Sequence, residues 1–414
     1  MNIKKIEIGD VLRDLSKFFT LFITMSNHLS LNNIPKELFL IILGNFSLKK
    51  LLDFGLVSTH FLSVVKNTPW SHVMPLIGSV TESMYFFVEN YKFRNYAFKG
   101  MFVTNDNLKK FGDLNLSQIT IDNCPLLSIE CLQFFKNCDT ITINWNIILD
   151  DSHLVYFLNY KKIIINSWNR ITTNGLKILE KCQQISIHFL VASNIINQFL
   201  LSYNNLHTIR LSGSTFVNRL TIECSQYLSN IKNLDLRVLK ITDEHIQYFT
   251  NCCYLNLSLT KIKGTTLHLL KNLHTVILNH CKITDNIVKT LGKLNNVSLC
   301  NCCKITDNGV SFLKNLCELN LKYCHRITDT SVKMLTGLHK LNIAYCRQVT
   351  DQSVKLLTKL HTLVVDGCTE LTNQGLCPLK NSHLISIVGC YKITLKRSNI
   401  VYDRSYSWND ELFR

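Results

Sequence analysis

Several familiar signatures are missing from this chain of 414 residues. No uninterrupted apolar run is long enough to cross a bilayer, which argues against a membrane protein. There is no glycine-rich phosphate loop, nucleophile elbow or H-E-x-x-H helix, and the 14 histidines are scattered along the chain. We therefore expect a protein that performs no catalysis of its own and uses no cofactor.

Cysteine is absent before Cys124 and then occurs 17 times, an odd number that recurs largely at one phase of a repeat. This pattern does not form a disulfide framework, so we expect a reducing compartment, either the cytoplasm or the nucleus. Cys300, Cys302 and Cys303 lie near His280 in the sequence, but their spacing fits no common zinc site. No metal site is predicted.

Acidic residues are also few, with 29 Asp and Glu against 45 Lys and Arg, which gives a formal net charge of +16. No run of Lys and Arg exceeds three residues, and no RNA-recognition or helix-turn-helix signature is present. We interpret the charge as a basic solvated surface. The alternative is attraction to an acidic protein or, as a weaker hypothesis, to nucleic acid.

The chain does contain a repeat with a period of 22 residues near its C-terminal end. Its core is Ile305-Thr306-Asp307, which returns as Ile327-Thr328-Asp329, Val349-Thr350-Asp351 and Leu371-Thr372-Asn373. Leu319 and Leu321 alternate with polar residues, as in a short strand with one buried face. The Thr or Asp can cap a helix, in which Val332 and Leu335 share one face. One strand and one helix per coil predicts an α/β leucine-rich-repeat solenoid, or horseshoe.

Cysteines occupy the turn after the strand in successive coils, at Cys281, Cys302, Cys324, Cys346, Cys368 and Cys390. A small buried thiol with a weak S–H donor suits a turn where carbonyls of neighbouring coils need partners. We predict a structural ladder. The pattern resembles the cysteine-containing subclass of leucine-rich repeats, most regularly over 240–392, and about thirteen strands are expected between Ile119 and Ile387.

Residues 30–75 contain no repeat and predict three short helices. Pro35 precedes apolar residues at helical spacing, Leu51 and Leu52 belong to a second helix, and Val57 and Phe61 to a third. A domain this small buries too little surface to be robust, so a partner is expected to cover the remaining apolar side chains. The plainer alternative is a helical cap that only seals the solenoid.

The order of these residues resembles an F-box. The resemblance implies docking on the Skp1 adaptor, which links to a cullin and a RING protein of a ubiquitin ligase. The matching positions are Ile34, Pro35, Leu38, Ile42, Leu43, Phe46, Leu48, Leu51, Leu52, Val57 and Phe61.

These patterns divide the chain into five segments. Residues 1–29 form an N-terminal extension, 30–75 the F-box-like domain and 76–100 a linker or solenoid cap. Residues 101–399 form the solenoid and 400–414 a C-terminal cap, since a terminal coil must hide its interior.

Outward strand positions of the solenoid should line its concave face and contact a target protein. Tyr323 and Tyr345 add aromatic anchors of the kind enriched in interfaces. The predicted binding residues are Asn296, Ser298, Glu318, Asn320, Lys322, Tyr323, Lys340, Asn342, Tyr345, Thr362, Val364 and Asp366.

The resemblance and the repeat together favour the substrate-recognition subunit of an Skp1–cullin–F-box E3 ubiquitin ligase. The F-box would bind the adaptor, and the solenoid would present a protein substrate for ubiquitination. The alternative is a stand-alone leucine-rich-repeat binding or inhibitor module with no role in ubiquitin transfer.

Overall fold

The computed structural model describes residues 63, 74–77, 91–112, 114–144, 149–165, 172–176, 178–179, 182–189, 206–213 and 220–402. The chain divides into two compact units, Met1–Ala97 and Phe98–Arg414. Ser63 is the one described residue of the predicted adaptor-binding domain before residue 74. The eleven predicted adaptor-binding residues therefore lie outside the described residues, as does the tail after Tyr402.

The described part of the first unit contains β1 (Leu76–Ile77) and the first three residues of β2, a strand that spans Asn95–Lys99. The Ala97 N–H donates to the Pro75 carbonyl at 2.9 Å, and Ile77 and Tyr96 are buried. These strands fall in the segment that the sequence assigns to a linker or solenoid cap.

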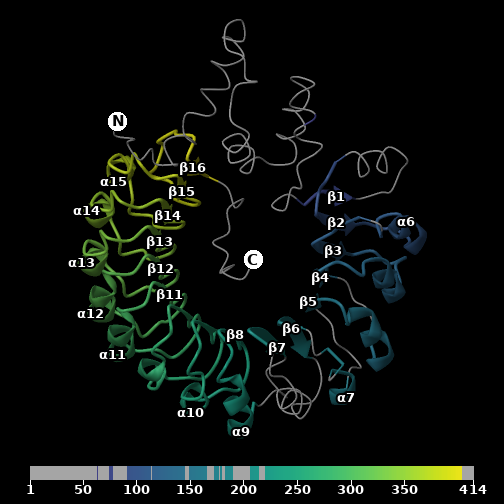
Figure 1. The fold of residues 1–414 in the computed structure, drawn as a ribbon. Coiled ribbons are helices and arrows are strands. Elements are labelled where there is room, and N and C mark those ends of the chain that lie inside the picture. Colours follow the sequence, from purple (N-terminus) through teal and green to yellow (C-terminus); the bar gives the residue numbers. More distant parts are fainter. Residues whose placement is uncertain are drawn as a thin grey trace, which may run out of the picture. The chain divides into compact units, whose positions relative to one another are not determined.

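The second unit is built on a parallel sheet in which each strand from β3 to β15 pairs with the next one along the chain (Figure 1). Thirteen strands from β3 to β15 lie within the described residues of this unit, over the region where about thirteen are expected. The strands are β3 (Gln118–Asp122), β4 (Thr140–Ile143), β5 (Lys162–Ile165), β6 (Gln184–Phe189), β7 (Thr208–Gly213), β8 (Asn233–Asp235), β9 (Tyr254–Asn256), β10 (Thr275–Ile277), β11 (Asn296–Ser298), β12 (Glu318–Asn320), β13 (Lys340–Asn342), β14 (Thr362–Val364) and β15 (Leu384–Ser386). A last strand, β16 (Ile400–Val401), pairs with β15 at the start of the predicted C-terminal cap.

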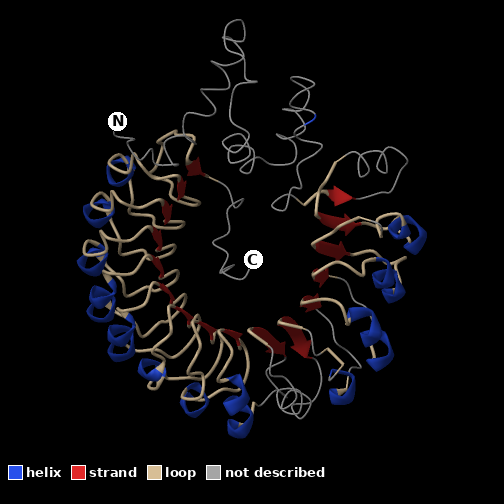
Figure 2. Ribbon diagram, viewed as in Figure 1, coloured by secondary structure: helices blue, strands red, loops and turns tan. Residues whose placement is uncertain are grey.

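Short helices lie on the side of this unit opposite the inner row of strands (Figure 2). The α-helices are α6 (Asn105–Lys109), α7 (Thr173–Leu176), α9 (Ile222–Ser225), α10 (Asp243–Ile246), α11 (Asp285–Val288), α12 (Asp307–Val310), α13 (Asp329–Val332), α14 (Asp351–Val354) and α15 (Asn373–Leu376). The 3-10 helices are η2 (Ile129–Phe134), η3 (Asp151–Phe157), η4 (Gln226–Leu228), η5 (Leu267–Leu269), η6 (Lys289–Leu291) and η7 (Ser311–Leu313). One strand and one short helix per coil confirm the predicted α/β solenoid.

The interior of each coil is filled by the apolar residues that define the repeat. Leu319 and Leu321 from the strand segment and Ile327, Val332 and Leu335 from the return segment are all fully buried. Burying a Leu, Ile or Val side chain contributes about 1.5–3 kcal/mol relative to exposure. Stacking of coils therefore stabilises each one, since no coil could cover this set alone.

The predicted cysteine ladder is confirmed. The Cys324 thiol donates to the Leu299 carbonyl of the preceding coil at 3.2 Å. The same contact joins Cys281 to Leu257 (3.1 Å), Cys302 to Leu278 (3.2 Å), Cys346 to Leu321 (3.2 Å), Cys368 to Ile343 (3.2 Å) and Cys390 to Val365 (3.1 Å). Burial raises the pKa of the Cys324 thiol to about 12, so the thiol stays protonated and keeps its donor.

A second ladder, which we call the Asp–Thr ladder, explains the Ile-Thr-Asp core of the repeat. The carboxylate of an Asp in one coil accepts bonds from the N–H and the hydroxyl of the Thr in the next coil. The pairs are Thr306 with Asp285 (2.8 and 2.6 Å), Thr328 with Asp307 (3.0 and 2.6 Å), Thr350 with Asp329 (2.9 and 2.6 Å) and Thr372 with Asp351 (2.9 and 2.5 Å). Each of these Thr residues also caps its own helix, as predicted. The link between coils was not predicted.

Candidate protein-binding face

The twelve predicted binding residues lie on β11 to β14 and in the turns that follow these strands. The sheet register places Asn296, Glu318, Lys340 and Thr362 in one row across the sheet. A second row holds Ser298, Asn320, Asn342 and Val364. Lys322, Tyr323, Tyr345 and Asp366 follow in the turns. The residues thus share one side of neighbouring coils, as the alternation of the repeat predicts.

The first row is accessible to a partner. Lys340 is exposed, and Glu318 and Thr362 are half-buried. The Lys340 Nζ lies 2.7 Å from Glu318 Oε1, so the two charges form an ion pair at the surface. Exposed pairs of this kind contribute little to stability, and the pair can therefore be rearranged by a ligand at small cost.

The second row is buried, which the strand alternation alone does not predict. Asn342 is 1% exposed, and its Oδ1 accepts a bond from the Ala344 N–H at 3.0 Å. Asn320 accepts from the Lys322 N–H at 3.1 Å in the same way, and Ser298 donates to Asn279 Oδ1 at 2.7 Å. These side chains hold the turns after the strands. They leave little area for a partner.

Two tyrosines form the aromatic part of the face. The rings of Tyr323 and Tyr345 stack with their centroids 4.5 Å apart and an interplanar angle of 16°. The Lys322 Nζ lies 5.2 Å from the first centroid and 5.8 Å from the second, close enough for cation–π attraction. Burial, followed by the neighbouring Tyr323, raises the pKa of the Tyr345 phenol. The phenol is therefore neutral at ordinary pH and can donate a hydrogen bond.

Backbone geometry fixes this stack. Both tyrosines have φ of +62°, and Gly367 occupies the equivalent position of the next coil with φ of +68°. A Cβ on Gly367 would lie 2.6 Å from Tyr345 Cδ1, so only glycine lets the ring lie over the next turn. Asp366 is likewise engaged, because its Oδ1 accepts from the Ser386 hydroxyl at 2.6 Å and from the Val388 N–H at 2.9 Å.

A cluster of charges on β7, on β8 and in the turn after β8, which we call the Asp235 cluster, was not predicted from the sequence. Arg210 pairs in register with Asp235, and Arg237 follows two residues later. The Asp235 side chain is fully buried, whereas those of Arg210 and Arg237 are 35% and 38% exposed. The signal in the sequence was a base on one strand, and an acid at the end of the next strand with a second base two residues later, but in this region the repeat is irregular.

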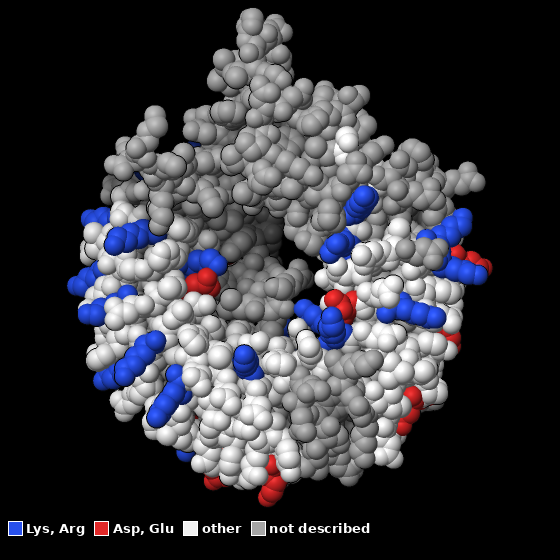
Figure 3. Space-filling view, in the orientation of Figure 1, with Lys and Arg blue, Asp and Glu red and all other residues white. Residues whose placement is uncertain are grey.

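The geometry of the Asp235 cluster is that of a shared carboxylate. Arg237 donates from Nε to Oδ1 at 2.9 Å and from Nη2 to Oδ2 at 2.7 Å, a bidentate pair. Arg210 Nε lies 3.0 Å from Oδ2 of the same carboxylate. On β5, burial and then the charge of Arg210 lower the pKa of Lys162. Figure 3 shows Lys and Arg side chains spread over the visible face of the molecule, with fewer Asp and Glu among them.

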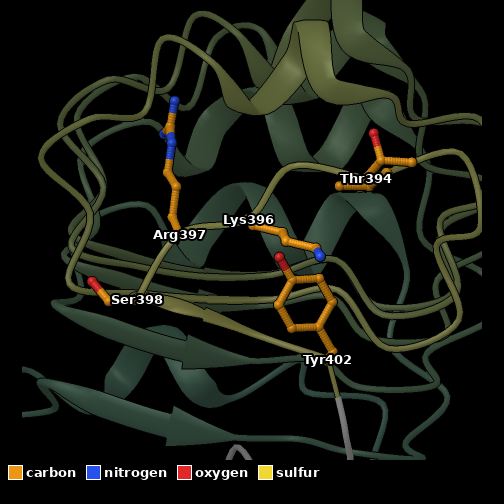
Figure 4. A pocket seen from close by; sticks show the side chains of 6 residues that line it. Thr394, Lys396, Arg397, Ser398 and Tyr402 are labelled. Atoms are coloured by element: carbon orange, nitrogen blue, oxygen red, sulfur yellow. The ribbon is translucent and has the colours of Figure 1, made fainter.

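A shallow pocket lies beyond β15. Its lining residues are Ile393, Thr394, Lys396, Arg397, Ser398 and Tyr402. Lys396 extends toward the Tyr402 ring, whereas Arg397 points away from it (Figure 4). The Arg397 guanidinium donates to the Leu376 and Cys377 carbonyls at 3.4 and 3.1 Å, and the Tyr402 hydroxyl donates to the Leu395 carbonyl. The Arg397 contacts tie the segment to the preceding coil, whereas the Tyr402 contact lies within the segment.

Within the described part of the chain, no group of three or more His, Cys, Asp or Glu residues is arranged to hold a metal ion. Cys300, Cys302 and Cys303, considered above for zinc, differ in exposure, and Cys302 belongs to the cysteine ladder. The same described residues include no helix with the length and apolar character needed to cross a membrane.

Comparison with known proteins supports the repeat. A family model described as leucine-rich repeat matches residues 270–292. Comparison with curated protein sequences gave no significant match.

Among solved structures, the fold is similar to that in the crystal structure of the yeast Rad7–Elc1 complex. The TM-score is 0.53 at 15% sequence identity, covering 72% of this chain and 83% of the other. The internalin InlF of Listeria monocytogenes gives a TM-score of 0.47 at 19% identity, covering 71% and 90% of the two chains. A leucine-rich-repeat protein of Leptospira interrogans gives 0.42 at 19% identity, covering 79% and 83%. The repeat match and the sheet topology together show that this chain contains an α/β leucine-rich-repeat solenoid.

Proposed function

We propose that this chain is the substrate-recognition subunit of an Skp1–cullin–F-box ubiquitin ligase. The observation that carries the proposal is the ordered run of apolar anchors from Ile34 to Phe61, which precedes a leucine-rich-repeat solenoid in the same chain. The anchors would bind the Skp1 adaptor, and the adaptor would connect the chain to a cullin and a RING protein. The solenoid would hold the target protein.

The second unit suits the target-binding role. Its parallel strands hold the exposed Lys340 in fixed register, and the half-buried Tyr323 and Tyr345 stack in the turns that follow, so little ordering is needed when a partner binds. A similar fold in yeast was crystallised as a complex of Rad7 with another protein, Elc1, which supports a role in protein assembly.

The mechanism in this proposal is proximity. The chain contributes no reacting group, and it raises the effective concentration of substrate lysines near the ubiquitin-conjugating enzyme by tethering both in one assembly. Substrate specificity would then depend on the exposed residues of the strand face, and coupling to the ligase on the N-terminal helices.

Co-purification of the full chain with Skp1 tests the proposal. We expect a stoichiometric complex that is lost with Leu38→Asp or Leu51→Asp, because a charge on an apolar anchor cannot be buried against the adaptor. Lys340→Asp, an equally drastic change on the strand face, is the matched control and should leave the complex intact. A folded chain that forms no complex with Skp1 would refute the proposal and favour a stand-alone binding or inhibitor module.

A further inference from the structure

Three histidines on successive coils form what we call the histidine column. His339, His361 and His383 stand directly before β13, β14 and β15, which are neighbours in the sheet (Figure 1). The His361 N–H donates to the His339 carbonyl at 2.8 Å, and the His383 N–H donates to the His361 carbonyl at 2.8 Å. These backbone bonds hold the three residues in register, so the stacking of coils fixes the column.

The imidazole rings of the column are neighbours at the surface. All three residues are exposed. The ring centroids of His339 and His361 are 5.3 Å apart, those of His361 and His383 are 5.2 Å apart, and the interplanar angles are 86° and 75°. Of the described residues, none forms a hydrogen bond or an ion pair with these ring nitrogens. The nitrogens can therefore bind a ligand from outside the chain.

The spacing of adjacent rings matches that of two histidines bound to one metal ion. Zinc binds an imidazole nitrogen at about 2.0–2.1 Å, and its ligands are arranged tetrahedrally. Because a ring nitrogen lies roughly 1.15 Å from the ring centre, two imidazoles on one zinc ion have centres about 5.2 Å apart. The column already has this separation. Rotation of exposed side chains is then enough to bring two nitrogens onto one ion.

The column can hold one ion at a time. Two strand spacings, about 10 Å, separate His339 from His383, so a single ion cannot contact all three rings. This agrees with the described residues, which include no group of three or more ligands arranged around one ion. A neutral imidazole offers one unprotonated nitrogen, so His361 can serve only one of its two neighbours.

We propose that the histidine column binds one divalent transition-metal ion of the zinc class, held between His361 and either His339 or His383. Imidazole is a common ligand of such ions, and water would complete the coordination. The ion would bridge two coils. Successive histidines are one repeat apart in the sequence, which by itself predicts no metal site here. The proposal does not rest on the adaptor or on ubiquitin transfer.

Isothermal titration calorimetry of the full chain with ZnCl₂ tests the column. Exposed thiols such as Cys303 can also bind zinc, so each variant is compared with the parent. His361→Ala should lose one bound equivalent, because neither pair remains. His339→Ala and His383→Ala should each keep that equivalent with affinity about twofold weaker, since one of two alternative pairs is left.

A control and a stability measurement complete the test. His268 is also exposed, but its Nδ1 lies 2.8 Å from the Thr265 carbonyl oxygen, and it stands outside the column. His268→Ala should therefore bind zinc as the parent does. Zinc should raise the melting temperature of the parent more than that of His361→Ala, because an ion that binds only the folded chain stabilises it.

Three outcomes would overturn the proposal. They are equal zinc binding by the parent and His361→Ala, loss of the same equivalent in His268→Ala, and loss of the equivalent in both His339→Ala and His383→Ala. Circular dichroism checks that each variant folds. If His361→Ala does not fold, the double variant His339→Ala/His383→Ala replaces it. This variant keeps the central histidine without a neighbour and should also lose the equivalent; retention would equally overturn the proposal.

Discussion

Asp329 offers a direct test of the Asp–Thr ladder, because its bonds run to the next coil. Its Oδ1 accepts from the Thr350 N–H at 2.9 Å, and its Oδ2 accepts from the Thr350 hydroxyl at 2.6 Å. The Ser353 hydroxyl donates to Oδ1 as well. We predict that Asp329→Ala destabilises the solenoid, and that the loss is concentrated in the coil that contains Thr350.

The magnitude follows from these three bonds. A hydrogen bond to a charged group contributes about 1.5–3 kcal/mol, but Asp329 and Thr350 are half-buried and water can replace part of the loss. We expect a decrease in unfolding free energy of about 2–4 kcal/mol for Asp329→Ala. Asp329→Asn should cost about 1 kcal/mol, because an amide oxygen can still accept. Asn373 already does so, accepting from the Thr394 N–H at 2.9 Å.

Urea-induced unfolding of the parent and both variants gives the stability differences, and amide hydrogen exchange locates them. Exchange at Thr350 and in its coil should accelerate more than exchange in the coil before Asp329. Equal stability of the Ala and Asn variants would refute the assigned role of the carboxylate. If amide exchange accelerated equally in all coils of the solenoid, the loss of stability would not be confined to the coil that contains Thr350, and the predicted local effect would be wrong.

Three further predictions concern the turns. Cys324→Ala should lower unfolding free energy by about 1–2 kcal/mol through the cavity it leaves, whereas exposed Cys303→Ala should be neutral in the same urea assay. Burial raises the pKa of the Cys324 thiol from 9.0 to about 12. Its contribution is therefore complete below about pH 9 and should diminish between about pH 9 and pH 12, so Cys324→Ala should lose less stability than the parent over that range. Gly367→Ala should lower the melting temperature, and Tyr345→Ala in the same chain should relieve part of that loss; additive effects would contradict the contact.

The sequence was sufficient for the regular part of the fold because each coil repeats the same physical pattern. Alternation around Leu319 and Leu321 predicts the strand from residues close in sequence. The cysteine phase predicts the ladder because a small thiol repeated at a buried turn needs a carbonyl of a neighbouring coil as its acceptor. The Asp–Thr ladder was not predicted because its partners are 21 residues apart, and a Thr before a helix is already explained as a cap. Nothing in the pattern around the Thr called for its further bonds to the Asp of the preceding coil.

The binding face was predicted less completely than the fold. Alternation places Asn320 and Asn342 on the outer side of the sheet, but it cannot tell that their amides turn back to bond the following N–H groups. The Asp235 cluster was missed because its residues come from coils where the repeat is irregular. Only the sheet register brings Arg210 and Asp235 together.

The Asp–Thr ladder also bears on how such a chain can change in length. Between Asp285 and Thr372 each coil receives a carboxylate from the coil before it and supplies one to the coil after it, so the four junctions of this ladder are chemically the same. Removal of residues 329–350 would join Thr328 to Asp351, leaving Asp307 to bond Thr328 and Asp351 to bond Thr372 as before. Within this stretch, whole coils can therefore be gained or lost by duplication or deletion with the Asp–Thr junctions preserved, whereas a change of any other length would break one.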